Sequence, residues 1–415
     1  MFRKRLFASA VLGAAILVSA LPAEERSITL EEAVAQAMER HASVIQARLE
    51  IDAARGRRMQ LAAVPNPELA FEAAGLPLWN SAGEKEFSLG FSQVVEHPRK
   101  RAVRREVGAL GEMRAGIELG RTLNIVRGRV ERAYFEAAFA EKSLADLESL
   151  LLNLEDYTGL AVERYKAGEV SYLDVVRGRL EILRVRNEIV EGRRLLKEKI
   201  LVLNLLMGNA GYTPLSFSTP LGFAPLGRTW EELKAAALAG SSMRLAAEGE
   251  KLAGRSLALA RTMTLPDITF GLFLPSKRFG GWGVGFGLSV PLRRTGPRGA
   301  AIEAEALVGQ ASVSTEARTR GILAALELAY ADALALEEQI RLFQESLLRE
   351  VEESLKTGIA NYRYGKSDSL GVLDIVKSLK EVRREYLKAL LNHRLSLIDI
   401  AAAGEEGAFG TGEIE

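Results

Sequence analysis

The sequence predicts a mainly α-helical fold with membrane β-strands, built from two copies of one unit. Three observations carry this prediction. Two long tracts, 99–213 and 298–415, contain no proline and are rich in Ala, Leu, Glu, Lys and Arg, as long helices require. Four short segments alternate large apolar residues with small or polar ones, which is the pattern of strands with one apolar face. Several short motifs also return about 200 residues later, which predicts an internal duplication.

The composition narrows the possible functions. The 415 residues carry 55 basic and 54 acidic side chains, so net charge gives no reason to expect a nucleic-acid partner. The absence of cysteine excludes disulfides, thiolate metal sites and a lipid anchor on an N-terminal cysteine. The three histidines, His41, His97 and His393, lack ligand spacing. No catalytic triad, Walker loop or dinucleotide fingerprint stands out, so we expect no enzymatic activity, no cofactor and no metal site.

Residues 1–23 are predicted to be a secretory signal peptide. Three basic residues at positions 3–5 precede an apolar run from Leu6 to Leu21, and cleavage is expected after Ala23 or Ala20. An uncleaved membrane anchor is the alternative, although the run is short for a span of about 20 residues. No later segment is apolar enough for a transmembrane helix, so any membrane contact would have to be made by strands.

The duplication sets the predicted domain boundaries. TLEE at Thr29 returns as TWEE at Thr229, and YKAGEVSYL at Tyr165 returns as YRYGKSDSL at Tyr362. We therefore expect a first repeat over 24–208, a linker over 209–228, a second repeat over 229–403 and a disordered acidic tail over 404–415. Each repeat should open with one continuous helix, 30–62 or 230–262, and continue through two strands into a long helix and a returning helix.

The long helices are predicted to pack as antiparallel coiled coils. A helix of about 60 residues would span about 90 Å at 1.5 Å per residue. Gly168 and Gly365 are placed to end the long helices, while Ser171 and Asp368 are suited to cap the returning ones. Asp174 lies three residues after Ser171 and would complete a capping box. Apolar residues on heptad spacing mark the expected seam: Leu144, Leu147, Leu151, Leu154, Ala161, Tyr165, Leu348, Val351 and Leu355.

The four strands are predicted at about 67–75, 86–95, 267–274 and 282–290, with hairpin loops at 80–83 and 277–280. Their length and alternation suit an outer-membrane barrel, and a small soluble sheet packed on a helix is the alternative. Four strands cannot close a barrel, so several subunits would have to combine. The predicted lipid-facing residues are Leu69, Phe71, Phe87, Leu89, Phe91, Ile268, Phe270, Leu272, Trp282, Val284, Phe286 and Leu288.

The arrangement of these segments resembles the TolC-like outer-membrane efflux protein family. The resemblance is carried by the opening segment 28–69, by the junction FSQVVEHPRKRAVRREV from Phe91, and by the two Y-x-x-G turns. The opening and the junction are most similar to the subgroup that serves heavy-metal exporters. The resemblance implies a homotrimer in the outer membrane of a Gram-negative-type cell, with a twelve-stranded barrel and a helical tunnel that extends into the periplasm.

The resemblance also implies a function and partners. Members of the family are not enzymes; they are passive exit ducts of tripartite pumps for small solutes such as metal cations or drugs. The implied partners are a periplasmic adaptor (membrane fusion) protein, an inner-membrane transporter of the proton-driven RND class, and outer-membrane lipid. The alternative is a soluble periplasmic coiled-coil protein, such as the adaptor itself.

The resemblance assigns roles to residues near the two turns. Tyr362, Asp374, Asp174 and Asp368 would lie at the periplasmic entrance, and the turns at Gly168 and Gly365 would contact the adaptor. Ser367 and Gly371 stand where charged partners are expected. A salt-bridged lock is therefore not expected, but an acidic ring of three Asp374 side chains would favour cations.

Basic residues follow the second and fourth strands: Arg99, Lys100, Arg101, Arg293 and Arg294. Positive charge at the start of a helix is unfavourable because it opposes the helix dipole. Another interaction is therefore needed to explain these basic residues. We expect these residues to lie beside anionic lipid head groups. An ordinary solvated run of charges is the alternative.

Overall fold

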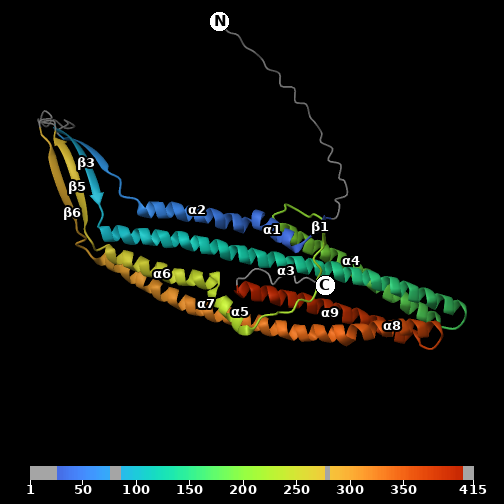
Figure 1. Cartoon of the computed structure of the whole chain (residues 1–415). Coiled ribbons are helices and arrows are strands. Elements are labelled where there is room, and N and C mark those ends of the chain that lie inside the picture. The colour runs from blue at the N-terminus through green and yellow to red at the C-terminus, as the bar shows by residue number, and fades with distance from the viewer. Residues whose placement is uncertain (1–25, 75–85, 276–280, 405–415) are drawn as a thin grey trace, which may run out of the picture.

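The computed structural model describes residues 26–74, 86–275 and 281–404. The molecule is elongated, with a β-sheet at one end, paired long helices along its length and two helical turns at the far end (Figure 1). The predicted signal peptide, both predicted hairpin loops and the predicted tail beyond Gly404 lie outside the described residues.

The sheet contains one β-hairpin from each repeat. Strands β2 (Glu68–Ala74) and β3 (Glu86–Val95) come from the first repeat, and β5 (Asp267–Pro275) and β6 (Gly283–Ser289) come from the second. Their order is β2-β3-β5-β6, and every neighbouring pair is antiparallel. The strands begin and end within one residue of the predicted bounds. The β3–β5 pairing is therefore the place where the two repeats share backbone hydrogen bonds.

Two long helical hairpins make up most of the molecule. Helix α3 (Pro98–Lys166) has 69 residues and is about 100 Å long at 1.5 Å per residue; α4 (Tyr172–Leu206) returns beside it. In the second repeat the outgoing run consists of α7 (Thr295–Leu342), the π-helical turn η1 (Phe343–Leu347) and α8 (Leu348–Arg363). Helix α9 (Ser369–Gly404) is its return. No helix in the described part of the chain is long and apolar enough to cross a bilayer.

The turns at the far end follow the prediction for helix-ending glycines. Gly168 and Gly365 have φ of 79° and 73°, a conformation that glycine adopts without strain. After α3, Gly168 N donates to Tyr165 O and Glu169 N donates to Arg164 O, both at 2.9 Å. The same pair of bonds recurs after α8, so both long helices end in a Schellman motif.

The prediction of continuous opening helices was wrong. Each is broken in two: α1 (Leu30–Arg40) and α2 (Ala42–Ala62), then α5 (Trp230–Ala239) and α6 (Ser241–Thr262). His41 has an extended backbone, with ψ of 127°, and its Nδ1 accepts a hydrogen bond from Ser43 N at 3.2 Å. Gly240 is extended in the same way, with ψ of 167°. The break frees α2 and α6 to pack along α3 and α7.

The linker between the repeats is ordered and packed, which the sequence pattern did not predict. Strand β4 (Leu215–Phe217) within it pairs in parallel with β1 (Arg26–Ile28) at the start of the described chain. The buried Tyr134 hydroxyl of α3 donates to Ile28 O at 2.9 Å and accepts from Thr219 N at 3.0 Å. Arg394 Nε of α9 donates to Gly222 O at 2.9 Å. The linker is thus fixed to both repeats.

The outgoing runs of the two repeats differ in one turn. Helices α7 and α8 with η1 have 48, 16 and 5 residues, which together equal the 69 residues of α3. Within η1, Leu348 N donates to Phe343 O, a bond from residue i+5 to residue i, and α3 has no such turn. A π-turn holds one residue more than an α-turn, so the buried face beyond it is displaced. Beyond the turn, Tyr362 is 1% exposed, while its repeat equivalent Tyr165, a predicted seam residue, is 44% exposed.

Candidate functional site: the sheet and the helical tip

The strand register places the predicted apolar residues on one face of the sheet. Directly opposed residues in an antiparallel pair share a face. One row across all four strands is Leu69, Phe91, Leu272 and Val284. Further rows join Phe71 with Leu89, Phe270 with Phe286, and Ile268 with Leu288, and Phe87 takes a register position on this face opposite Ala73. Trp282 lies just before β6 rather than within it.

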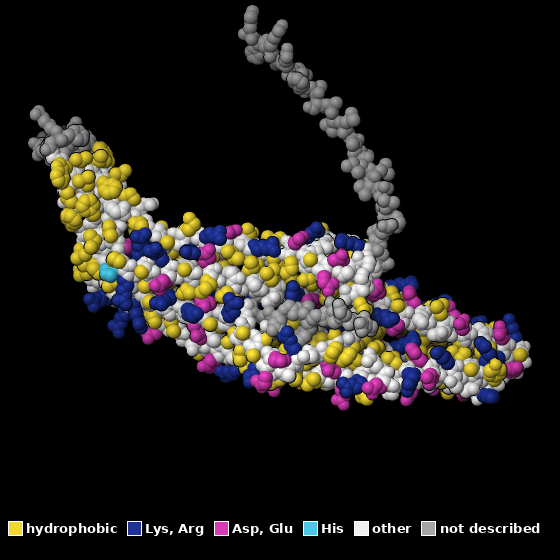
Figure 2. All heavy atoms as spheres, in the orientation of Figure 1, with side chains coloured by type: hydrophobic (Ala, Val, Ile, Leu, Met, Phe, Trp, Pro, Cys, Tyr) yellow, Lys and Arg dark blue, Asp and Glu magenta, His cyan; other side chains and the backbone are white. Residues whose placement is uncertain are grey.

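This apolar face is open in the single chain. Leu69 is 76% exposed and Phe286 is 79% exposed, and Figure 2 shows hydrophobic side chains gathered over the sheet. A contiguous apolar surface of this kind is rare on soluble monomers. The opposite face of the sheet is different: its rows contain mainly small or polar residues, including Gly90, Gly271, Gly285 and Gly287. The sheet therefore has one apolar face and one face of small or polar residues.

Basic side chains gather where the strands meet the helices (Figure 2). Arg99, Arg101, Arg293 and Arg294 are exposed there. Lys100 was expected to face lipid head groups or solvent. Instead, its Nζ lies 2.8 Å from Asp267 Oδ2. His97 N also donates to Asp267 Oδ1 at 3.1 Å. These two contacts tie the start of α3 to the start of β5.

At the far end, the two helical turns face each other across a cleft of about 510 Å³. The Arg164 guanidinium lies 4.9 Å from the centre of the Tyr362 ring, donates to Tyr362 O and pairs with Glu169 at 2.9 Å. Arg164 therefore connects the turn of the first repeat to the end of α8. Sequence reasoning missed this residue, because its repeat equivalent is Asn361 and no motif marks it.

Tyr362 is part of the packed interior of the tip in the single chain, and its ring is not on the exposed surface. Its ring centre lies 5.1 Å from that of Tyr157, whose hydroxyl donates to Ser369 Oγ at 2.7 Å. Burial raises the pKa of the Tyr362 phenol, and the nearby Asp174 carboxylate adds to this effect. Burial likewise raises the pKa of Tyr157. Both phenols are therefore neutral at physiological pH.

The predicted acidic residues have three different environments. Asp368 Oδ1 accepts a hydrogen bond from Gly371 N at 3.0 Å and so caps α9, as predicted. Ser171 occupies the N-cap of α4 without making a capping bond, so the capping box with Asp174 does not form. Asp174 instead lies 3.5 Å from Arg177 Nη1 and 3.4 Å from Ser171 Oγ. Asp374 is exposed, with Lys377 Nζ at 3.7 Å.

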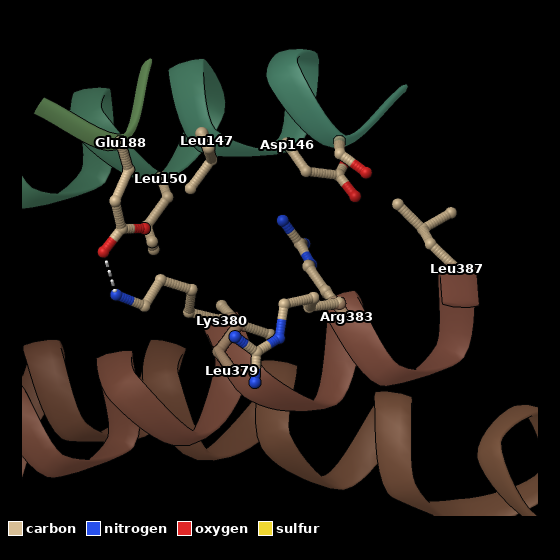
Figure 3. Close-up of a pocket in the computed structure, with 10 residues that line it drawn as sticks. Asp146, Leu147, Leu150, Glu188, Leu379, Lys380, Arg383 and Leu387 are labelled. Carbon is tan, nitrogen blue, oxygen red and sulfur yellow. Dashed lines mark hydrogen bonds and ion pairs between the residues drawn. The ribbon is translucent and has the colours of Figure 1, made fainter. Parts of the chain in front are cut away.

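A smaller pocket of about 180 Å³ lies between the tip and the middle of the rod, where α3 and α4 meet α9 (Figure 3). Leucines from α3 and α9 form its wall. Lys380 Nζ reaches across to Glu188 of α4 at 2.8 Å, and Arg383 pairs with Glu352 of α8 at 2.6 Å. The Lys380–Glu188 pair links the two hairpins, and the Arg383–Glu352 pair lies within the second. Among the described residues, no three His, Asp or Glu side chains are grouped to hold a metal ion.

Comparison with known proteins agrees with this architecture. The sequence model of the outer membrane efflux protein family matches residues 235–403. No curated protein matches the chain significantly. The solved structure of CusC, described as forming a transmembrane channel, superposes with a TM-score of 0.79 at 20% identity, covering 91% of this chain and 92% of that one.

Two further outer-membrane proteins have the same fold. The outer membrane protein VceC from Vibrio cholerae has a TM-score of 0.74 at 17% identity, covering 92% of this chain and 97% of that one. The open-state MtrE outer membrane channel from Neisseria gonorrhoeae has a TM-score of 0.75 at 18% identity, covering 91% and 89%. The partial family match and the shared fold agree with the resemblance of the sequence to the TolC-like outer-membrane efflux proteins.

Proposed function

We propose that this protein is the outer-membrane exit duct of a tripartite efflux pump. The observation that carries the proposal is the continuous apolar face of the four-stranded sheet, at one end of a long rod with a charged surface. Lipid covers such a face, while the small-residue face lines a water-filled lumen. Three chains, each donating four strands, close the barrel that a single chain leaves open at both sheet edges.

The rest of the rod then extends into the periplasm as a helical tunnel. The outer membrane is the location of this family, and the turns at Gly168 and Gly365 lie at the opposite end of the molecule from the sheet (Figure 1). In this orientation the turns reach toward the inner membrane. We propose that they contact a periplasmic adaptor protein, which joins the duct to an inner-membrane transporter of the RND class.

The proposed entrance lies at the tip. Asp374 is an exposed acid there, and three copies would form an acidic ring, partly balanced by Lys377. Asp174 and Asp368 line the cleft between the turns, while Tyr362 packs beneath it. Rings of carboxylates favour cations in pores, which supports a duct that admits cations at least as readily as anions.

The proposed cargo is a small solute, either a metal cation or a drug. The sequence resemblance to the heavy-metal subgroup favours metal cations. Deleting the gene and comparing tolerance to copper, zinc, nickel and lipophilic drugs tests the cargo directly. Lower tolerance to the metals alone would support the metal assignment, and lower tolerance to the drugs alone would overturn it.

The first test of the duct itself is fractionation of cells that express the full chain, followed by mass determination in detergent. We expect an outer-membrane particle of three chains that requires detergent and conducts ions in planar bilayers. A soluble monomer or dimer would contradict the proposal and favour the periplasmic coiled-coil alternative.

A further inference from the structure

Phe273 is an exception to the pattern of the sheet. Its neighbours Leu272 and Leu274 point to the apolar face, so Phe273 lies on the small-residue face, in one row with Gly90 and Gly283. It is the only aromatic residue on that face among the described strand residues. Its side chain is 46% exposed.

The strand beside it leaves room for the ring. A Cβ atom added at Gly283 would lie 2.4 Å from both Cε2 and Cζ of Phe273, and one added at Gly285 would lie 3.8 Å from Cε1. Gly287 is different, since its nearest neighbour would be Thr269 Cβ at 3.5 Å, an ordinary contact. The Phe273 ring therefore lies against β6 and occupies the space that a side chain at position 283 would fill.

The position along the strand is also informative. Asp267, at the start of β5, is tied to α3 through Lys100, and Phe273 lies near the other end of β5, away from the helices. If the small-residue face lines the lumen, as in the proposed function, Phe273 projects into the lumen near its outer end. A trimer would carry three such rings at one level.

We propose that Phe273 forms an aromatic constriction near the outer end of the duct, and that Gly283 positions its ring; this inference rests on the proposed function. Exposing an aromatic ring to water is unfavourable, and no other described strand residue on this face is aromatic. The three rings reduce the free cross-section and provide an aromatic contact for solutes as they leave. Ring faces of this kind attract organic groups and cations.

A purely stabilising role for the Phe273–Gly283 contact is the alternative, because an aromatic side chain can cover a glycine on the neighbouring strand. The two roles predict different results. A stabilising contact changes unfolding only, whereas a constriction changes the current through an intact trimer.

The first experiment uses the absence of cysteine from the chain. The variants Phe273→Cys and Phe286→Cys are each reconstituted into liposomes and treated with a charged, membrane-impermeant maleimide. We expect Phe273→Cys to react at least about tenfold faster, because Phe286 lies on the face assigned to lipid, where no water is present. Faster labelling of Phe286→Cys would overturn the inference.

The second experiment measures single-channel conductance in planar bilayers. Phe273→Ala removes the ring and should raise single-channel conductance about 1.2-fold or more, because a wider pore carries more current. Gly283→Ala pushes the ring off β6 into the lumen and should lower conductance. Gly287→Ala is the matched control on the same strand and should leave it unchanged. Trimer melting in detergent is recorded for each variant.

The outcomes separate this inference from the proposed function. A conducting wild type with unchanged conductance in Phe273→Ala overturns the constriction and leaves the duct intact, and a lower melting temperature alone then assigns the stabilising role. A wild type that does not conduct overturns the duct and the inference together. Opposite changes in Phe273→Ala and Gly283→Ala, with Gly287→Ala unchanged, support the constriction.

Discussion

At the scale of single residues, Glu131 is an unusual charge. It lies within α3 and is only 4% exposed. Burial raises the pKa of its carboxyl to about 7, and the positive charge of Arg127, one turn earlier, lowers it only in part. An exposed glutamate titrates near 4.5. In the folded protein Glu131 therefore stays protonated up to about pH 7.

We predict that Glu131→Gln stabilises the trimer at pH 8 and has no effect at pH 4. A carboxyl whose pKa is raised on folding contributes stability below about pH 4.5, and that stability is lost as pH rises through about 7. The difference between the two pKa values corresponds to roughly 3 kcal/mol per chain at alkaline pH. Thermal unfolding in detergent at both pH values checks this prediction. An equal effect of the substitution at pH 4 and pH 8 would contradict it.

Arg164 is the second residue with a specific expectation. It contacts both turns through Glu169 and Tyr362, so we expect Arg164→Gln to loosen the tip by about 1–2 kcal/mol. This corresponds to roughly 5–30-fold faster proteolysis at the turns, measured by limited digestion of the folded trimer. Arg177→Gln is the control, because Arg177 pairs with Asp174 of its own helix only. Equal digestion of both variants would argue against a role for Arg164 in joining the turns.

The tip also shows which residues sequence could identify. Gly168 and Gly365 were predictable, because a helix end followed by glycine is a local signal. The burial of Tyr362 and its contact with Arg164 were not predictable, because they depend on how two turns about 200 residues apart pack together. The sequence also suggested a capping box for Asp174, whereas the structure pairs this residue with Arg177 three positions later in the same helix.

At the scale of elements, period-two alternation was a reliable guide. It places Ile268 and Leu288 on one face, and the observed register pairs them directly. The break at His41 escaped prediction because the flanking residues Arg40 and Ala42 are good helix formers. At Gly240 the glycine followed by two serines was a local signal for a break. Phe273 was overlooked, since its neighbours Leu272 and Leu274 already satisfied the expected alternation.

The π-helical turn η1 leads to a prediction about deletions. Because η1 holds one residue more than an α-turn, deleting Ser346 lets the turn close as an α-helix while α7 and α8 keep their positions. We expect the trimer to assemble with nearly unchanged stability. Deleting the repeat-related Ser149 removes a residue from the uninterrupted α3 and rotates everything beyond it by about 100°. We expect that deletion to cost about 3 kcal/mol or more.

Detergent-resistant trimer yield and melting temperature compare the two deletions. Both remove an intrahelical serine, so their chemistry is matched. If deletion of Ser346 proves as damaging as deletion of Ser149, then η1 is itself required for assembly and does not merely hold a surplus residue.

At the scale of the whole molecule, the duplication explains why one chain has two different ends. Each repeat contributes one strand hairpin to the sheet and one helical hairpin to the tip. The repeats join through the β3–β5 pairing at one end and through contacts such as Arg164–Tyr362 at the other. The long helices connect the two ends.

The four exposed arginines between the sheet and the helices, Arg99, Arg101, Arg293 and Arg294, form what we call the basic collar. In the proposed orientation the collar lies at the periplasmic surface of the outer membrane. Each basic residue near an anionic surface contributes about 1 kcal/mol of attraction. In this proposed placement, attraction to anionic lipid would offset the unfavourable position of positive charge at helix starts.

We predict that replacing all four collar arginines by glutamine removes the stabilisation that anionic lipid gives the wild type. The wild-type trimer should melt at a higher temperature in vesicles containing phosphatidylglycerol than in pure phosphatidylcholine, and the collar variant should melt at the same temperature in both. A control variant with four exposed arginines of the second outgoing helical run replaced, Arg320, Arg341, Arg349 and Arg363, should respond to lipid as the wild type does. High salt should reduce the wild-type response, because exposed charges are screened over about 10 Å at 0.1 M salt. A collar variant that keeps its full response to phosphatidylglycerol would show that these arginines are ordinary solvated charges.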